Sequence, residues 1–365
     1  MGWTWNDISI AAGAPANTVG SSTVAANVLA AHGTQHVFYS SSFEGQVHEL
    51  WCDRHGWHFN DLALRSVVGS IGARSAWSFE SQLTEHVACI GEDFHVHELY
   101  RDHGSWHSND LTLATGVPSG LGLGPGEPIP AGYVFASQGT QHVNYRRNDG
   151  HVIELFWDGH WHFNDLTVAA CATDVPNSET VGYAFEAQAT QHVIYRGGDS
   201  HIIEMWWQNG VWNVNDLTVA TGGPLAFSQL AMGASGYVFA AQGTQHVVFL
   251  GEDFHIHEFW WDGNGWHHND LTNAAGAPVA ADSSFPTGYV FAAQGTQHVN
   301  YWGPDDHIHE LWWDGNGWHH NDLTIASGAP DASGYPVGYG FDAQNTQHVF
   351  FRNPDSNVTQ LTWSP

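Results

Sequence analysis

HIHELWWDGNGWHHNDLT, at residues 307–324, decides the fold, because versions of this stretch recur from one end of the chain to the other. A second phrase, GYVFAAQGTQHVNY at residues 288–301, precedes it, and related phrases precede the other copies. Together the two phrases make a unit of about fifty residues, a period that is typical of repeat architectures. Turns and connections between such units make up the rest of the chain.

Three landmarks show that the unit occurs seven times. The His of a Q-H-V-like phrase falls at seven positions: His36, His86, His142, His192, His246, His298 and His348. The Trp that opens a W-x-x-N-D phrase falls at Trp3, Trp57, Trp106, Trp161, Trp212, Trp266 and Trp318. An acid precedes the aromatic pair in six units, and Gln360 replaces it in the seventh: Glu49, Glu98, Glu154, Glu204, Glu258 and Glu310.

Each unit reads as four short strands. In the sixth unit we expect them near residues 289–293, 297–302, 307–313 and 318–324, rich in Val, Ile, Tyr, Phe and Trp. The DGNG sequence at residues 314–317 is a compact hairpin connection. Four strands in a repeat of this length are typical of a β-propeller blade. The prediction is an all-β, seven-bladed β-propeller with four antiparallel strands per blade and no segment of helical periodicity.

The two ends of the chain predict that the ring is closed. The chain opens with WTWNDIS, the end of a unit, and stops at QLTWSP, where a unit is unfinished. We therefore expect the N-terminal strand to complete the last blade, whereas a linear solenoid would need polar capping repeats. The prediction is one domain, 1–365, with blades at about 26–64, 77–113, 133–168, 183–219, 237–273, 289–325 and 339–363 plus 3–10.

The chain is acidic, with 37 Asp plus Glu against 8 Lys plus Arg and a formal net charge of −29. This charge argues against nucleic acid and anionic membrane surfaces as partners, and it suits a neutral or cationic ligand. No apolar run is long enough to span a bilayer, and the first residues are needed in a blade, so we expect no signal peptide in this chain. We expect a soluble protein, synthesised in the cytoplasm, whose final location stays open.

The recurring His and Glu have two interpretations. As a general acid and base they would form the same active site seven times around a ring, which is unusual for an enzyme. A buried hydrogen-bond network explains the recurrence better, because buried polar groups must be paired. Gln360 favours this interpretation, since an amide can accept a hydrogen bond but cannot act as a base. We therefore expect no catalytic residue.

Three His-x-His pairs place two imidazole rings on one face of a strand, which suits a metal ion: His95/His97, His255/His257 and His307/His309. In the third and fourth units Ile153 and Ile203 replace the second His, and the sequence shows no consistent third ligand. Cys52, Cys89 and Cys171 stand at unrelated positions, which argues against a disulfide framework or a cysteine zinc site. We therefore expect neither a metal nor another cofactor.

Tryptophans flank the turn between the third and fourth strands. The first-to-second and third-to-fourth turns repeat closely and share one side of the ring, which we call the repeated face, whereas the other connections vary. The paired residues are Trp157/Trp161, Trp207/Trp212, Trp261/Trp266, Trp313/Trp318 and, across the chain ends, Trp363/Trp3. The second member occurs in all seven units and indicates packing between blades. Cys52 and Arg101 replace the first member in two units, so the first member is a candidate ligand contact.

Sugars stack their apolar faces on indole rings, while polar groups at the rim bind their hydroxyls. The candidates for this second role lie at the repeated turns: Gln138, Gln188, Gln242, Gln294, Thr140, Thr190, Thr244, Thr296, His162, His267 and His319. Weak pockets repeated around a ring gain strength against clustered ligands. The pattern therefore predicts a multivalent lectin, in which Trp313→Ala weakens sugar binding and leaves the fold intact.

The phrases QHV at 297–299, HIHELWW at 307–313 and GWHHNDL at 317–323 resemble the seven-bladed propeller lectins first described from Photorhabdus. The resemblance covers essentially the whole chain. It implies a carbohydrate-binding protein without a catalytic step, with pockets between neighbouring blades for L-fucose and related or O-methylated sugars. The expected partners are fucosylated or methylated glycans, and homo-oligomers occur in the family. Because the first two units are degenerate, we expect fewer than seven working pockets.

Two other functions compete with the lectin. A propeller glycosidase would concentrate its carboxylates at one central site, whereas these acids are distributed by the repeat, and the S-x-D-x-G-x-x-W phrase of sialidase propellers is absent from the sequence. A protein-interaction scaffold would use one variable patch, which the connections between blades could supply. The Trp-rich repeated face favours the lectin over both.

Overall fold

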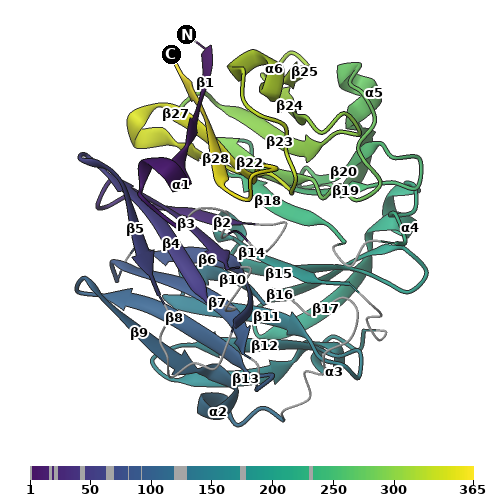
Figure 1. Ribbon diagram of the computed structural model, residues 1–365. Coiled ribbons are helices and arrows are strands. Elements are labelled where there is room, and N and C mark those ends of the chain that lie inside the picture. Colours follow the sequence, from purple (N-terminus) through teal and green to yellow (C-terminus); the bar gives the residue numbers. More distant parts are fainter. Residues whose placement is uncertain are drawn as a thin grey trace.

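The chain folds into seven antiparallel four-stranded sheets arranged as the blades of a β-propeller (Figure 1). The computed structural model describes residues 2–15, 19, 24–41, 46–62, 70–80, 82–91, 93–118, 130–172, 178–229 and 233–365. The predicted fold is confirmed. Residues 63 and 64 of the expected first blade, and most of the connection at 116–130, lie outside the described residues.

The first four blades follow one another in chain order. Blade 1 contains β2 (Ala25–Leu29), β3 (Thr34–Ser40), β4 (Val47–Asp53) and β5 (Gly56–Asp61). Blade 2 contains β6 (Ser70–Phe79), β7 (Thr84–Gly91), β8 (Val96–Asp102) and β9 (Ser105–Asp110). Blade 3 contains β10 (Ala131–Phe135), β11 (Thr140–Arg146), β12 (Val152–Trp157) and β13 (Trp161–Asp165). Blade 4 contains β14 (Thr180–Phe185), β15 (Thr190–Arg196), β16 (Ile202–Gln208) and β17 (Val211–Asp216).

The last three blades repeat this order. Blade 5 contains β18 (Ser235–Phe239), β19 (Thr244–Leu250), β20 (Ile256–Trp261) and β21 (Trp266–Asp270). Blade 6 contains β22 (Thr287–Phe291), β23 (Thr296–Trp302), β24 (Ile308–Trp313) and β25 (Trp318–Asp322). Blade 7 contains β26 (Val337–Phe341), β27 (Thr346–Arg352), β28 (Val358–Ser364) and, from the other end of the chain, β1 (Gly2–Asp7).

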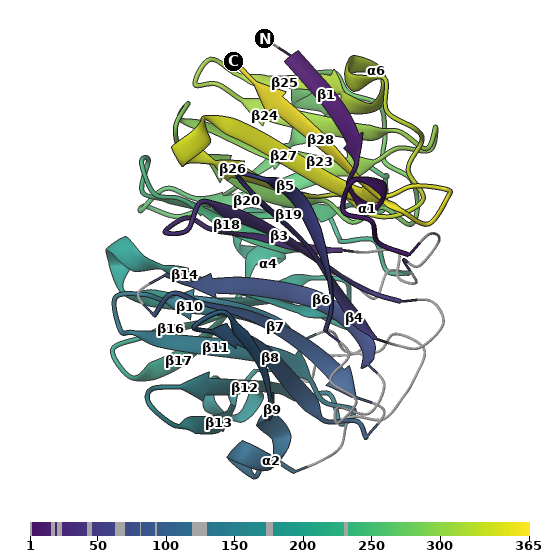
Figure 2. The ribbon, with the colours of Figure 1, turned by 60° about the vertical axis from the view of Figure 1, so that its left-hand side comes forward.

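Strand β1 closes the ring. It pairs antiparallel with β28, so that Trp3 lies opposite Trp363 and Asp7 opposite Thr359. Figures 1 and 2 show both chain ends at the top of the molecule, with purple β1 alongside yellow β28. The predicted completion of the last blade by the N-terminal strand is confirmed.

In six blades of the described part of the chain a short helix follows the fourth strand, which corrects the expectation of strand through residue 324. These helices are α1 (Ile8–Ala11), α2 (Leu111–Thr115), α3 (Leu166–Ala169), α4 (Leu217–Thr221), α5 (Leu271–Ala275) and α6 (Leu323–Ser327). Asp322 ends strand β25 and caps α6, because its side chain accepts a hydrogen bond from the Ile325 N–H at 2.9 Å. Thr324 accepts from the Ile308 N–H at 2.9 Å and so ties the helix to β24. None of the helices described in this chain is long and apolar enough to span a membrane.

The Gly-Tyr phrase at the start of a unit fits neighbouring blades together. A Cβ added to Gly288 would lie 2.2 Å from the ring of Tyr237 in the preceding blade, so only glycine leaves room for that ring. The Tyr237 hydroxyl then donates to Gln297 Oε1 at 3.1 Å, again across the blade boundary. Between blades 1 and 2 both partners differ: Asn27 replaces the Tyr and Ala76 replaces the Gly. The Gly-Tyr phrase therefore marks the start of a strand and also supplies the residues that pack one blade against the next.

Each hydrophobic cluster of the core joins two adjacent blades. In one cluster Tyr183 and Leu217 of blade 4 pack with Phe249 and Phe259 of blade 5, and Trp266 of β21 packs against them. The other second-position tryptophans occupy the same place in six further clusters. Burial of aliphatic and aromatic surface between neighbouring blades thus stabilises the ring.

Candidate functional site between blades 2 and 3

A buried chain of hydrogen bonds crosses every blade between its second and third strands. In blade 6, His298 Nε2 lies 2.7 Å from Thr296 Oγ1, and His298 Nδ1 lies 2.8 Å from Glu310 Oε1. All three side chains are buried. The structure thus shows the buried network that the recurring His and Glu predicted.

Blade 7 shows what the carboxylate contributes to this chain. There the Gln360 amide replaces the Glu, and its Nε2 lies 2.9 Å from His348 Nδ1. Burial lowers the pKa of His348 to about 4. With no carboxylate to balance its charge, this imidazole stays neutral at physiological pH.

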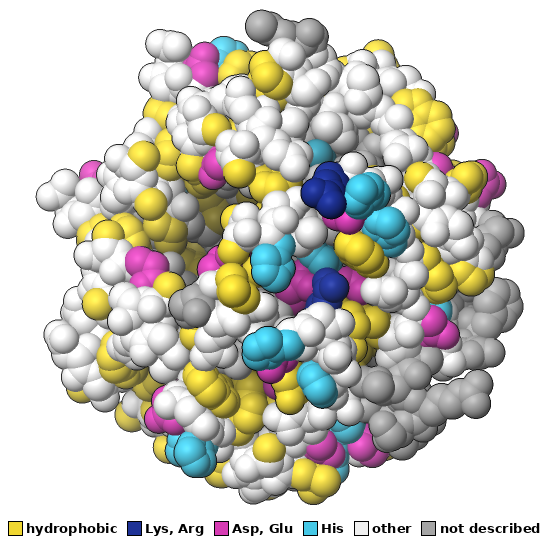
Figure 3. All heavy atoms as spheres, turned by 90° about the vertical axis from the view of Figure 1, so that its left-hand side faces the viewer, with side chains coloured by type: hydrophobic (Ala, Val, Ile, Leu, Met, Phe, Trp, Pro, Cys, Tyr) yellow, Lys and Arg dark blue, Asp and Glu magenta, His cyan; other side chains and the backbone are white. Residues whose placement is uncertain are grey.

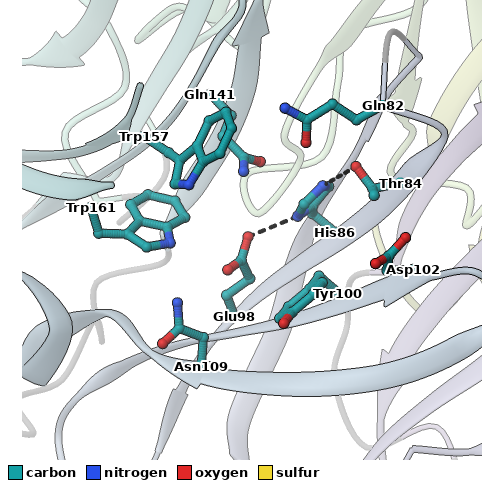
Figure 4. A pocket seen from close by; sticks show the side chains of 10 residues that line it. All are labelled: Gln82, Thr84, His86, Glu98, Tyr100, Asp102, Asn109, Gln141, Trp157 and Trp161. Atoms are coloured by element: carbon teal, nitrogen blue, oxygen red, sulfur yellow. Dashed lines mark hydrogen bonds and ion pairs between the residues drawn. The ribbon is translucent and has the colours of Figure 1, made fainter. Parts of the chain in front are cut away.

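A cavity of about 540 Å³ lies between blades 2 and 3. Two indole rings of blade 3, Trp157 and Trp161, form one wall, and Gln141 of β11 lies beside them (Figure 4). Blade 2 supplies the rest of the lining: Gln82, Thr84, His86, Glu98, Tyr100, Asp102 and Asn109. Figure 4 shows the polar groups of blade 2 opposite the two indoles, with the His86–Glu98 and His86–Thr84 hydrogen bonds at the base. The volume suits a small ligand such as a monosaccharide.

Strand register puts the aromatic wall in place. Gln141, Trp157 and Trp161 lie side by side on β11, β12 and β13, because each is the direct partner of the next. Trp157 also stacks edge to face on Phe79 of blade 2, with ring centroids 6.4 Å apart. Each indole is half-buried, so one part packs between the blades while the rest faces the cavity.

The paired tryptophans recur at four more junctions between neighbouring blades. In each predicted pair the two tryptophans are direct cross-strand partners: Trp207 and Trp212, Trp261 and Trp266, Trp313 and Trp318, and Trp363 and Trp3. The first member stacks edge to face on a Phe of the preceding blade: Phe135, Phe185, Phe239 and Phe291, at 6.2–6.3 Å. Trp212 is buried and the other seven are half-buried.

The predicted polar residues divide into three groups. The glutamines lie at the repeated turns, exposed or half-exposed: Gln138, Gln188, Gln242 and Gln294. The threonines are buried and bonded to the imidazole of their own blade: Thr140, Thr190, Thr244 and Thr296. Gln82 and Thr84 are the blade 2 counterparts of these two groups, and both line the cavity.

The third group, the second-position histidines, lies beside the aromatic residue of the third strand. His162 stacks on Phe156 with ring centroids 5.0 Å apart, whereas His267 and His319 lie tilted against Trp260 and Trp312 at 4.6 and 4.5 Å. Each also pairs with an Asp of the turn: Asp158, Asp262 and Asp314. Their counterpart in blade 2, His107, stacks on Tyr100, and Tyr100 is the residue that lines the cavity.

The sequence interpretation missed the lining contributed by blade 2. Glu98 belongs to the recurring His and Glu that were interpreted as a buried network, Asn109 belongs to a landmark phrase that was given no role, and Tyr100 and Asp102 lie in a unit that is degenerate in sequence. The cavity nevertheless forms, because its indoles come from blade 3. The signal was present in the sequence, since the recurring Glu and Asn lie on the same face of the blade as the Thr-His pair.

The irregular residues of blades 1 and 2 meet at the junction between these two blades. Arg101, which stands in the place of a first-position Trp, donates to Glu85 at 3.2 Å and lies over the ring of Trp51 at 5.7 Å. Glu85 also lies 2.6 Å from His36, which is paired with Glu49. Burial lowers the pKa of His36, but the two carboxylates outweigh burial and raise it above its usual value. The cavity here is smaller, about 230 Å³, and is lined by Glu85 and Arg101 instead of paired indoles.

One face of the molecule carries histidines and basic side chains close together (Figure 3). Figure 3 shows one face of the molecule, on which histidines gather around the two Lys or Arg side chains in view, with acidic and hydrophobic side chains between them. The few basic groups of this face therefore lie among groups that can balance their charge, in a chain whose net charge is −29.

The His-x-His pairs have more partners than the sequence indicated. His307 Nδ1 lies 2.8 Å from Asp322 Oδ2, so the Asp that caps α6 also binds the first His of the pair. In blade 2 the ligand atoms of Asp93, His95, His97 and Asp110 all lie within 4.8 Å of one another. Two carboxylates thus lie beside this pair that the sequence pattern did not show, because Asp93 comes from a turn and Asp110 from another strand.

No protein-family model matches the chain, and no curated protein matches its sequence. Solved structures match it in fold. The BP39L lectin from Burkholderia pseudomallei gives a TM-score of 0.73 at 13% identity, covering 94% of this chain and 96% of the lectin. The SapL1 lectin in complex with alpha methyl fucoside gives 0.53 at 21% identity, covering 80% and 92%. A variant of the Aleuria aurantia lectin in complex with Fucα1-6GlcNAc gives 0.53 at 18% identity, covering 80% and 91%. Similarity at these identities establishes the shared fold alone.

Proposed function

We propose that this protein is a multivalent lectin that binds sugars in the pockets between neighbouring blades. The observation that carries the proposal is the cavity between blades 2 and 3, where Trp157 and Trp161 face a wall of polar side chains. A pyranose ring has one face of C–H groups and a rim of hydroxyls. The indole wall of the cavity suits the C–H face, and the polar wall suits the hydroxyls.

The polar wall offers groups that fit sugar hydroxyls. The Glu98 carboxylate and the amides of Gln82, Asn109 and Gln141 can accept hydrogen bonds, and the amides can also donate them. Glu98 is held in place by His86, whose other ring nitrogen is held by Thr84. The network therefore fixes the binding groups in advance, which reduces the entropy lost when a ligand is ordered.

L-fucose and related or O-methylated sugars are the proposed ligands, and fucosylated or methylated glycans are the proposed partners. A methyl substituent adds apolar surface that can be buried on indole, at about 0.8 kcal/mol for each buried carbon group. Two of the similar structures are described as complexes with alpha methyl fucoside and with Fucα1-6GlcNAc, which supports this sugar class. The resemblance of the repeated phrases to Photorhabdus-type lectins supports it independently.

Five junctions carry the paired indoles, and these are the proposed binding sites: those between blades 2 and 3, 3 and 4, 4 and 5, 5 and 6, and 6 and 7. The junction between blades 1 and 2 holds Arg101 in place of the first indole, and the junction between blades 7 and 1 holds Cys52. Several weak sites on one face strengthen binding to clustered glycans.

A glycan-array screen with and without EDTA, followed by calorimetric titration with α-methyl-L-fucoside, tests the proposal. We expect binding to fucosylated or methylated glycans that survives EDTA. Trp157→Ala should remove one site and weaken multivalent binding about tenfold or more, whereas Trp5→Ala, an exposed indole outside the paired positions, should not. If the protein bound no glycan at all, the lectin proposal would be wrong, and a role as a protein-interaction scaffold would be favoured.

A further inference from the structure

A cluster of two histidines and two aspartates lies at the edge of blade 2, on the side opposite the indole pockets. Asp93 and His95 belong to the turn between β7 and β8, His97 to the start of β8, and Asp110 to the end of β9. The distances are 2.8 Å from His95 Nδ1 to Asp110 Oδ2, 3.0 Å from His97 Nε2 to Asp93 Oδ1, and 3.7 Å from His95 Nδ1 to Asp93 Oδ2.

We propose that Asp93, His95, His97 and Asp110 form a binding site for Zn²⁺. Zinc in proteins takes four nitrogen, oxygen or sulfur ligands in a tetrahedron at about 2.0–2.2 Å, which places neighbouring ligand atoms about 3.3 Å apart. The three distances between ligand atoms given above, 2.8, 3.0 and 3.7 Å, lie on either side of this value. Two carboxylates and two neutral imidazoles give a charge of −2, which a divalent cation neutralises.

The surroundings of the cluster favour occupancy by a cation. His97 is buried, whereas Asp93 is a third exposed, so the ion has an entry path and a partly desolvated site. A Cβ on Gly91 would lie 2.4 Å from Asp93 Oδ1 and 2.7 Å from His97 Nε2, so glycine leaves room for both ligands to converge. The net charge of −29 raises the local concentration of cations.

The other blades provide a natural comparison. Blades 5 and 6 keep the glycine, both histidines and both aspartates, but there His257 and His309 hydrogen bond to a further imidazole, at 3.1 and 3.0 Å. Three ligands converge in each of these blades: Asp253, His255 and Asp270, and Asp305, His307 and Asp322. In blade 3, Ile153 replaces the second His, and Arg147 binds Asp149 through Nε at 2.8 Å. Among these blades, blade 2 alone brings four ligand atoms within 4.8 Å of one another in the described residues, so we expect it to bind zinc most tightly, and blade 3 lacks the second His.

Zinc titration of the purified chain, without a polyhistidine tag and in competition with a chromogenic chelator, tests the proposal. We expect one tight site in the wild type, and substitution by Co²⁺ should give the intense visible absorption of a tetrahedral complex. His97→Ile installs the residue found in blades 3 and 4, and it should weaken the tight site more than 100-fold, beyond the roughly 10–100-fold effect of losing an outer-shell partner. Asp93→Asn, which preserves side-chain size, should have the same effect.

Asp149→Asn in blade 3 is the matched control and should leave zinc binding unchanged. If the wild type binds zinc only weakly, or if His97→Ile and Asp93→Asn retain the tight site, the proposal is wrong. Because the cluster lies at the opposite ends of the strands from the indoles, EDTA should remove zinc without affecting sugar binding. The zinc proposal and the lectin proposal can therefore be refuted independently of each other.

Discussion

Replacing Gln360 with Glu gives blade 7 the carboxylate that the other six blades place against the same imidazole. In the wild type His348 is buried beside an amide, and burial lowers its pKa to about 4, against an unfolded value of 6.5. The unfolded chain therefore binds a proton below pH 6.5 that the folded chain binds only below pH 4. Stability from this residue is present above pH 6.5 and is lost as the pH falls towards 4.

The size of the effect follows from the two pKa values. The difference of about 2.5 units corresponds to about 3 kcal/mol when both states are fully titrated, and to about 2.5 kcal/mol between pH 7 and pH 4.5. A carboxylate at position 360 stabilises the imidazolium and raises the pKa of His348. Gln360→Glu should therefore lose about 2 kcal/mol less stability than the wild type over this interval.

Urea unfolding monitored by tryptophan fluorescence at pH 7 and pH 4.5 measures this difference, since the other histidines contribute equally to both proteins. An NMR titration of the His348 imidazole tests the cause directly and should give a midpoint near 4 in the wild type. The reverse substitution Glu310→Gln in blade 6 is the matched control and should increase the loss of stability in acid. Equal losses in the wild type and Gln360→Glu would refute the reasoning.

Three further outcomes are expected. Gly288→Ala should destabilise the fold by about 1–3 kcal/mol in urea unfolding, because the new Cβ meets Tyr237 at 2.2 Å, whereas Gly317→Ala, in open space, should be tolerated. Trp313→Ala should lower the number of fucoside sites in calorimetry by one and leave the circular dichroism spectrum unchanged; an unaltered titration would count against this pocket. Because the pKa of His36 is raised, its contribution to stability is present below pH 6.5 and is lost as the pH rises through its folded pKa. His36→Asn should therefore cost more stability at pH 6 than at pH 9, and equal costs would contradict the pairing with Glu49 and Glu85.

The repeat made the fold predictable from the sequence. Seven copies of one phrase, and a chain that begins with the end of a unit, are enough to predict both the blade number and the closure by β1. The short helices were missed because four or five residues cannot show helical periodicity. Their signal is the single Asp of the N-D-L-T phrase, which ends a strand and caps a helix at the same residue.

The candidate site was only half predictable, because each pocket combines two blades. The sequence identified Trp157 and Trp161 but could not show that they face the Glu98 wall of the preceding blade. For the same reason Arg101 alters the junction with blade 1 and leaves the cavity with blade 3 open. Convergence of Asp93 and Asp110 on the His-x-His pair likewise depends on a turn and on strand pairing, which residue spacing does not show.

A crystal structure of the protein soaked with α-methyl-L-fucoside tests the central claim most directly. We expect sugar density between blades 2 and 3, with the apolar face of the pyranose against Trp157 or Trp161 and its hydroxyls towards Glu98, and similar density at the other paired-indole junctions. Empty inter-blade pockets at saturating fucoside, or sugar bound only elsewhere on the molecule, would contradict the claim.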